Sequence, residues 1–189
     1  NTALGKTTLV YNVSGSDNLA AGSESLYKNI SGSSNVALGN RASYSNIDGN
    51  NIIAIGDSAL YYNTSSSNMG IGAKALLYNT TGVSNTSIGN QSMSSNSTGS
   101  QNTAVGRIAL YGNTTGIQNT AIGFSAARYN QSGNGNTTLG FQSLLFNVAN
   151  NNNTAIGHIA LANTTADNNT GIGKSALADN TFGTSNTAV

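Results

Sequence analysis

Apolar side chains recur along the chain at a fixed interval, within a five-residue phrase that ends in glycine. The phrase reads Asn-Thr-Ala-Ile-Gly at residues 119–123, and close variants of it fill the chain from end to end. A regular period of this length indicates a solenoid, in which one unit cannot bury its apolar face alone and stacks on its neighbours. The glycine recurs every 17 residues, with two steps of 16, at Gly5, Gly22, Gly39, Gly56, Gly72, Gly89, Gly106, Gly123, Gly140, Gly157 and Gly173.

We number each repeat from the Asn of this phrase as position 1, so that the glycine is position 5. Position 4 is aliphatic in almost every repeat and position 9 is mostly leucine, and we expect these two columns to form a dry core. The small residues of positions 3 and 8 would suit a narrow interior. The position-4 column comprises Leu4, Leu38, Ile55, Ile71, Ile88, Val105, Ile122, Leu139, Ile156, Ile172 and Val189. The position-9 column comprises Leu9, Leu26, Leu60, Leu76, Met93, Leu110, Leu144, Leu161 and Leu177.

The alternation of positions 2 to 4 predicts a short β-strand in each repeat. A 17-residue unit rich in Asn, Gly, Ser and Thr is too short to hold two helices. The sequence therefore predicts an all-β fold, a parallel β-solenoid (β-roll) with two short strands in each 17-residue coil and about eleven rungs, continuous over residues 1–189. At about 4.8 Å per rung, this rod would be roughly 50 Å long.

Two kinds of residue indicate the corners of the coil. The constant glycine of position 5 predicts one turn, and the glycine that eight repeats carry at position 15 predicts another, because glycine tolerates positive φ. Asn recurs at position 1 and at position 12, where stacked amides can hydrogen-bond to the rungs above and below. Proline would delete a rung-to-rung donor within a strand, and the chain contains none.

Composition narrows the range of functions. Only 7% of the residues are charged, and the net charge is +1, so we expect no binding to nucleic acid. Cysteine is absent, which excludes disulfides and thiolate metal sites. The apolar runs are far shorter than the ~20 residues that span a bilayer, so no membrane insertion is expected. The six acidic residues are scattered over different columns, and we expect no catalytic site, no metal site and no cofactor.

Aromatic residues gather at positions 10 and 11 and predict a stripe along one side of the rod. One interpretation is a contact surface for a glycan, a host-surface ligand or a partner, because aromatic rings with a polar group favour interfaces. The alternative is stacking from rung to rung, or packing between protomers. The stripe comprises Tyr11, Tyr27, Tyr44, Tyr61, Tyr62, Tyr78, Tyr111, Tyr129 and Phe146.

Positions 6 and 7 carry seven of the thirteen charged residues together with His158, and predict a solvated corner of mixed charge. A lone His has no second ligand or nucleophile to act with, so we interpret His158 as a solvated turn residue. Eight Asn-x-Ser/Thr motifs, such as those at Asn79 and Asn113, fall at the position-12 corner. Glycans on adjacent rungs would collide, which favours a turn and ladder role for these Asn residues over glycosylation.

The Asn-Thr-Ala-Ile-Gly phrase, followed by a small residue, any residue and Leu, resembles the head repeats of trimeric autotransporter adhesins of the YadA type. It is also similar to the Asn-Thr-Gly-rich arrays of bacterial surface proteins and phage tail fibres, and residues 102–118 carry the likeness best. This resemblance implies a left-handed parallel β-roll and three chains around one axis. It also implies a location outside the cell, on the cell surface or on a virion.

We therefore expect a structural fibre or adhesin segment, a stiff rod for adhesion or display, and not an enzyme. The chain opens and closes on the repeat phrase, so we expect a fragment of a longer protein that forms a homo-oligomer, as a trimer or an end-to-end filament. A phage tail-fibre shaft is the alternative. Ice binding is a third hypothesis, based on the threonines at position 2 of the later repeats: Thr86, Thr103, Thr120, Thr137, Thr154, Thr170 and Thr187.

Overall fold

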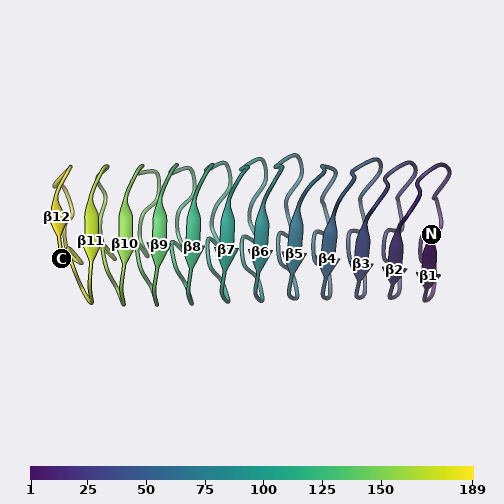
Figure 1. Ribbon diagram of the computed structural model, residues 1–189, viewed down its shortest axis with the longest axis horizontal. Helices are drawn as coiled ribbons and strands as arrows, with labels where there is room; N and C mark the ends of the chain where they lie inside the picture. The colour runs from purple at the N-terminus through teal and green to yellow at the C-terminus, as the bar shows by residue number, and fades with distance from the viewer.

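A computed structural model describes all 189 residues as an all-β rod without helices. Twelve short strands occupy positions 2 to 4 of successive coils and lie side by side along the rod, from β1 at the N-terminal end to β12 at the C-terminal end (Figure 1). They are β1 (Thr2–Leu4), β2 (Leu19–Ala21), β3 (Val36–Leu38), β4 (Ile53–Ile55), β5 (Met69–Ile71), β6 (Thr86–Ile88), β7 (Thr103–Val105), β8 (Thr120–Ile122), β9 (Thr137–Leu139), β10 (Thr154–Ile156), β11 (Thr170–Ile172) and β12 (Thr187–Ala188).

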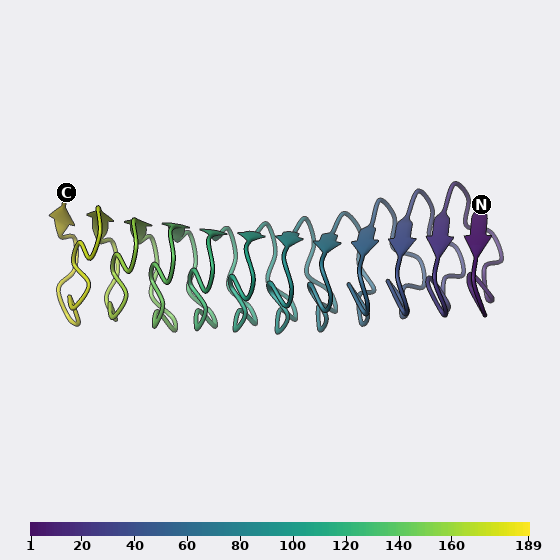
Figure 2. The same cartoon turned by 90° about the horizontal axis from the view of Figure 1, so that it is seen from below.

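The strands form one parallel sheet in chain order, and each pairs in register with its neighbours. Thr103 lies opposite Thr120, for example, and Val105 opposite Ile122. The predicted parallel β-solenoid of about eleven turns and 17-residue coils is confirmed. Figure 2 shows the strands along one side of the rod and the turns along the other, and the strand direction turns gradually from one end to the other. The sheet face therefore winds slowly about the rod axis, as the inherent twist of strands requires.

The prediction of two strands in each coil is wrong, because each coil has one. The return segment, positions 6 to 12, is a series of turns in which positions 7 and 9 are left-handed. Leu26 has a φ of 47° and Leu110 of 47°. A left-handed residue with a side chain costs roughly 1–2 kcal/mol, while burying a leucine yields about 1.5–3 kcal/mol. Burial of the position-9 leucine therefore offsets the cost at its own position in most coils, while Ser43 (φ 51°) and Ala127 (φ 47°) adopt the same conformation without it.

Hydrogen bonds of the return segment also run between coils, as in a sheet. The Leu26 N–H donates to the Ala42 carbonyl at 3.0 Å, and the Leu110 N–H to the Ala126 carbonyl at 2.9 Å. Of 121 backbone hydrogen bonds, only 22 lie wholly within the strands. The turn side therefore binds one coil to the next although it contains no strand.

Position 9 forms the core as expected, but position 4 does not. The position-9 side chains of Leu26, Leu60 and Leu110 are fully buried, and they pack against the alanines of position 3 and position 8. Position 4 points out of the sheet instead, and Leu139 is 47% exposed. Positions 2 and 4 lie on one face of the strand and position 3 on the other. The interior is too narrow for a second column of large side chains, since a Cβ added to Gly70 at position 3 would lie 3.1 Å from Leu60 Cγ.

The position-5 glycines lie where a side chain has neither space nor an allowed backbone. Gly106 has a φ of 135°, and a Cβ on it would lie 2.5 Å from the carbonyl oxygen of Gly123 in the next coil. Glycine is required at position 15 for a different reason from the positive φ that the sequence analysis predicted. The φ of these glycines is not positive, but a Cβ on Gly99 would lie 2.5 Å from both Asn96 Oδ1 and the Gly116 carbonyl oxygen. The left-handed residue of this corner is position 17, as at Ser84 with a φ of 58°.

Two ladders of buried Asn side chains run inside the rod, as the sequence predicted. At position 12, Asn113 Nδ2 donates to Asn96 Oδ1 at 2.7 Å and to the Gly116 carbonyl at 3.1 Å, while Asn113 Oδ1 accepts from Asn130 Nδ2 at 3.0 Å. At position 1, Asn102 Oδ1 accepts from the backbone N–H of Asn119 at 2.9 Å. These amides satisfy the polar groups of a corner that water does not reach.

The position-12 ladder ends in the second of the two 16-residue coils, residues 153–168. Thr164 stands there in place of Asn, and the buried Asn147 Oδ1 has no partner. The Asn153 Nδ2 of the position-1 ladder is also unpaired. An unmatched buried amide costs about 1–3 kcal/mol, so this coil is a weak point of the rod.

Replacing one ladder amide should destabilise the rod measurably. Asn113→Ala removes two donated hydrogen bonds and one accepted bond at a fully buried position, and we expect the free energy of unfolding to fall by about 2–3 kcal/mol. Denaturant unfolding followed by circular dichroism measures it. Thr115→Ala, an exposed change in the same coil, is the control. Equal effects of the two changes would contradict the role of the ladder.

The position-5 glycine should tolerate no side chain. Gly106→Ala adds a Cβ at a φ of 135° beside the next coil, and we expect a loss of at least about 2 kcal/mol in the free energy of unfolding. Gly135→Ser is the matched control, because Gly135 has a φ of 64° and the equivalent Ser84 has a φ of 58°. A Gly106→Ala variant as stable as the wild type would contradict this expectation, because the neighbouring coils would then accommodate a Cβ at position 5.

Candidate functional site

The aromatic residues of position 10 form a stacked column on the surface of the first coils. Tyr27 stacks on Tyr44 with ring centroids 5.1 Å apart and planes 7° apart, and Tyr44 stacks on Tyr61 at 4.9 Å and 3°. All three side chains are half-buried. In-register pairing places equivalent side chains one rung apart, and this spacing suits ring stacking.

Three tyrosines of position 11 extend this column into a continuous group. Tyr11 meets the edge of Tyr27 at 5.1 Å, Tyr62 meets Tyr61 at 4.6 Å, and Tyr62 stacks on Tyr78 at 5.4 Å. We call these six residues the tyrosine array: Tyr11, Tyr27, Tyr44, Tyr61, Tyr62 and Tyr78.

The remaining members of the predicted stripe lie apart from the array. Tyr129 stacks on Phe146 at 5.3 Å, and Tyr111 has no aromatic neighbour but lies under the Arg128 guanidinium at 6.0 Å. Stacking between rungs, one of the two interpretations of the stripe, is therefore present. This stacking covers the ring faces that a sugar would contact. The role of the stripe as a contact surface stays a prediction.

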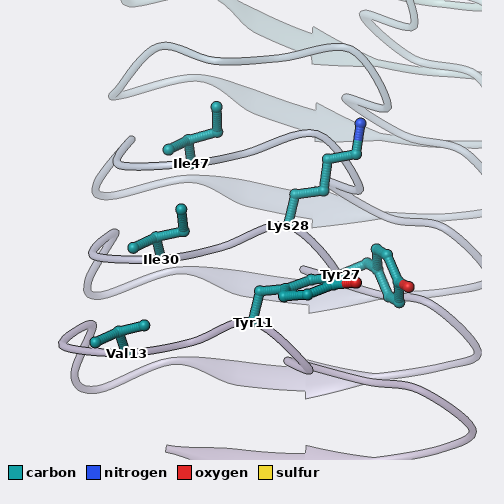
Figure 3. A pocket seen from close by; sticks show the side chains of 6 residues that line it. All are labelled: Tyr11, Val13, Tyr27, Lys28, Ile30 and Ile47. Carbon is teal, nitrogen blue, oxygen red and sulfur yellow. The ribbon is translucent and has the colours of Figure 1, made fainter.

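An open groove of about 460 Å³ lies beside the first members of the array. Tyr11 and Tyr27 form one wall, a row of aliphatic side chains at position 13 forms the other, and the Lys28 side chain lies above Tyr11, one coil along the rod (Figure 3). The Lys28 ammonium also lies 5.3 Å from the centre of the Tyr44 ring. The sequence analysis did not find this groove, although position 13 is aliphatic in the first three coils: Val13, Ile30 and Ile47.

The environment of the array raises the pKa of two of its phenols. A side-chain hydrogen bond with Tyr11 raises the pKa of Tyr27 above 10.0. Burial raises the pKa of Tyr61, and the neighbouring Tyr44 adds to the effect. The Glu24 carboxylate, which accepts a hydrogen bond from Arg41 Nε at 2.8 Å, raises the pKa of Arg41. Both Tyr27 and Tyr61 therefore stay protonated to a higher pH than a free tyrosine.

The charged corner at position 6 contains a second column that the sequence analysis missed. Phe124 stacks on Phe141 at 5.4 Å, Phe141 stacks on His158 at 5.2 Å, and the Arg107 guanidinium lies 5.6 Å from the Phe124 ring. His158 is exposed as expected, but its ring covers Phe141. The two Phe residues at successive position 6 were the signal that could have revealed it.

The outer face of the sheet carries two columns of side chains without a charge. Position 4 is a large aliphatic residue in every coil but that of β2, and position 2 changes from apolar residues in β2 to β5 to threonine from β6 onward. From β2 to β5 both columns are apolar, with Leu19 41% exposed. From β6 to β12 a threonine column lies beside the aliphatic one. Nothing within the chain covers this face.

The Asn-x-Ser/Thr motifs of position 12 lie mostly in the interior. Asn79, Asn96, Asn113 and Asn130 are fully buried, and the amide nitrogen of each donates two hydrogen bonds within the ladder. An amide nitrogen so engaged offers no room for a glycan. Asn163 differs, because in the 16-residue coil it falls at position 11 and donates to Asp179 Oδ1 at 2.6 Å.

The acidic residues and His158 do not form a metal site. No group of three or more His, Asp or Glu residues lies close enough to hold a metal ion. The structure also contains no helix that could cross a membrane.

The raised pKa of Tyr61 predicts a loss of stability in alkali. A phenol whose pKa is higher in the folded chain stabilises the fold below pH 10.0, and this contribution is lost as the pH rises through the folded-state pKa. We expect the thermal unfolding midpoint to fall above pH 10 and to fall less steeply in Tyr61→Phe. An equal decline in both chains would contradict the burial of this phenol.

Comparison with known protein families, with curated proteins and with solved structures found no match to this chain.

Proposed function

We propose that this chain is a structural rod, a repeat segment of a fibre or adhesin that extends from a cell surface or a virion. Its role is to act as a rigid spacer that sets the distance and orientation of the parts it joins. The repeating side-chain columns on its surface contact partner molecules. The proposal assigns it no catalytic activity.

The observation that carries this proposal is the pairing of strands strictly in chain order. Each strand contacts only the strands before and after it, and every pairing is parallel and in register. The chain therefore grows in one dimension by about 4.8 Å per coil. Such a molecule buries its core only through its neighbouring coils, and its length depends directly on the number of repeats.

The uncovered sheet face supports assembly with further copies of the same chain. All-parallel sheets are almost always covered on both faces, but here Ile55, Ile88 and the rest of the position-4 column face solvent. A partner that contacts many rungs alike must repeat at the same spacing, and a copy of this chain does so. We therefore include a homo-oligomer, as a trimer or a filament, in the proposed function.

The same face gives less support to ice binding. A crystal surface is flat and rigid, whereas the strand direction turns along the rod (Figure 2). The threonine column of β6 to β12 therefore winds away from any single plane, and the column beside it is aliphatic. A partner that winds with the rod fits this surface better.

A charge placed on the sheet face should break the oligomer. We expect the native mass of the wild-type chain to be a multiple of 19.1 kDa, and Val105→Lys to reduce it to that of one chain. Val105 lies at position 4 in the middle of the face, where a buried lysine would have no partner. Gln118→Lys places the same charge at an exposed position of the same coil and should leave the mass unchanged.

A stable, soluble wild-type monomer would contradict the oligomer and count against the fibre. An oligomer that persists in Val105→Lys but is lost in Gln118→Lys would place the interface on the turn side. Small-angle scattering of the Val105→Lys variant tests the rod independently, because the shape of a single chain does not depend on assembly.

A further inference from the structure

We propose that the tyrosine array is a site of oxidative modification, at which neighbouring phenols are joined by dityrosine cross-links between successive coils. The modification goes beyond the proposed structural role and does not depend on the oligomeric state. Its oxidant is hydrogen peroxide, acting through a haem peroxidase.

Geometry is the first reason for the proposal. Tyr27, Tyr44 and Tyr61 form near-parallel stacks at centroid distances of 5.1 and 4.9 Å, so the faces of successive phenol rings oppose one another. Their backbones are held one rung apart by hydrogen bonds such as Lys28 N–H to the Tyr44 carbonyl at 3.1 Å. Two phenols held face to face at this fixed spacing need not meet by diffusion, which makes their coupling effectively unimolecular.

Access is the second reason. Tyr11, Tyr62 and Tyr78 are 53%, 45% and 52% exposed, and Tyr27, Tyr44 and Tyr61 are half-buried. The array therefore lies on the surface of coils 1 to 5, where a small oxidant or a peroxidase can remove electrons. The ring contacts also run without a break from Tyr11 to Tyr78, so a radical formed at one ring has a partner beside it.

The chemistry balances without any group from the chain besides the two phenols. Each phenol gives up one electron and one proton and becomes a phenoxyl radical. Two radicals form one carbon–carbon bond between ortho positions, and the hydrogen atoms of these carbons move to the oxygens, which restores both phenols. The two electrons and two protons reduce one hydrogen peroxide to two water molecules.

A cross-link between Tyr27 and Tyr44 would close a loop of one coil. Such a bond restricts the unfolded chain in the way that a disulfide does, and so favours the folded state. It also adds a covalent tie on the turn side, where hydrogen bonds and the packing of buried side chains otherwise join the coils. The modification would stiffen the N-terminal coils of a rod that contains no cysteine.

The experiment treats the full chain with horseradish peroxidase and hydrogen peroxide, then digests the monomer band from a denaturing gel with trypsin. Cleavage after Lys and Arg separates Tyr27, in residues 7–28, from Tyr44, in residues 42–74. We expect these two peptides to be joined with the loss of two hydrogen atoms. This product should be about tenfold or more above any product of Tyr111 or Tyr129, which have no tyrosine neighbour.

Tyr44→Phe is the matched variant, because phenylalanine preserves the stack but cannot form the bond. We expect it to lose the link between residues 7–28 and 42–74, to keep the link from Tyr62 to Tyr78, and to unfold near the wild-type midpoint. In urea the selectivity for the array should disappear. Links to Tyr111 or Tyr129 in equal yield, or a monomer band without the joined peptides, would overturn the proposal.

Discussion

The close stacking of successive coils is the constraint on which the rest of this structure depends. Backbone groups of each coil bond to the coils before and after it on the turn side as well as in the sheet, as the Leu26 N–H does to the Ala42 carbonyl. The approach is so close that a Cβ has no space at position 5 of most coils, as at Gly106, or at the position-15 glycines, as at Gly99. Buried Asn amides then supply the donors and acceptors that a solvent-free corner requires. Glycine, asparagine and the absence of proline all follow from this one requirement.

The same stacking explains the surface. In-register pairing repeats every side chain at one-rung intervals, so like charges at one position would repel along the whole rod. The chain carries few charges, and it forms one ion pair between adjacent coils, from Arg41 to Glu24. Aromatic rings suit the same interval, and two independent columns stack at the corners. The unusual composition thus reflects residue types that can stack on identical side chains in the next coil.

The sequence was sufficient to predict the period, the parallel solenoid, the position-5 turn and both Asn ladders, because each depends on residues that recur in almost every coil; Ile52 at position 1 and Thr164 at position 12 are the exceptions in the ladders. The sequence-based prediction was wrong where the more apolar position is not the one that points into the core. Position 4 is more apolar than position 3, yet Ala104 is buried and Ile88 is exposed, since the interior admits only one large column and Leu110 fills it. The second strand failed for another reason. No propensity scale predicts left-handed leucines, which are stable here only through burial and inter-coil hydrogen bonds.

The tyrosine array lay within the predicted stripe, but its division into a continuous group and isolated residues required the coil register. Tyr61 and Tyr62 are neighbours in sequence, and their rings join the position-10 column to the position-11 column. The Phe124 column followed from the same rule at a position where the sequence indicated only solvated charge. The position of a residue within its coil thus decides which side chains it contacts in the next coil.

Small residues and a short coil also divide the rod. Ala127 occupies the leucine position of its coil, and the apolar core separates there into a long N-terminal cluster and a smaller one around Leu144 and Leu161. The Asn ladder stops soon afterwards, at Thr164. A repeat array owes its cooperativity to contacts between neighbouring units. The core break at Ala127 and the ladder break at Thr164 therefore make this part of the rod the least resistant to force. Under tension along its axis, this rod would open first at its C-terminal coils and leave the tyrosine-bearing end intact.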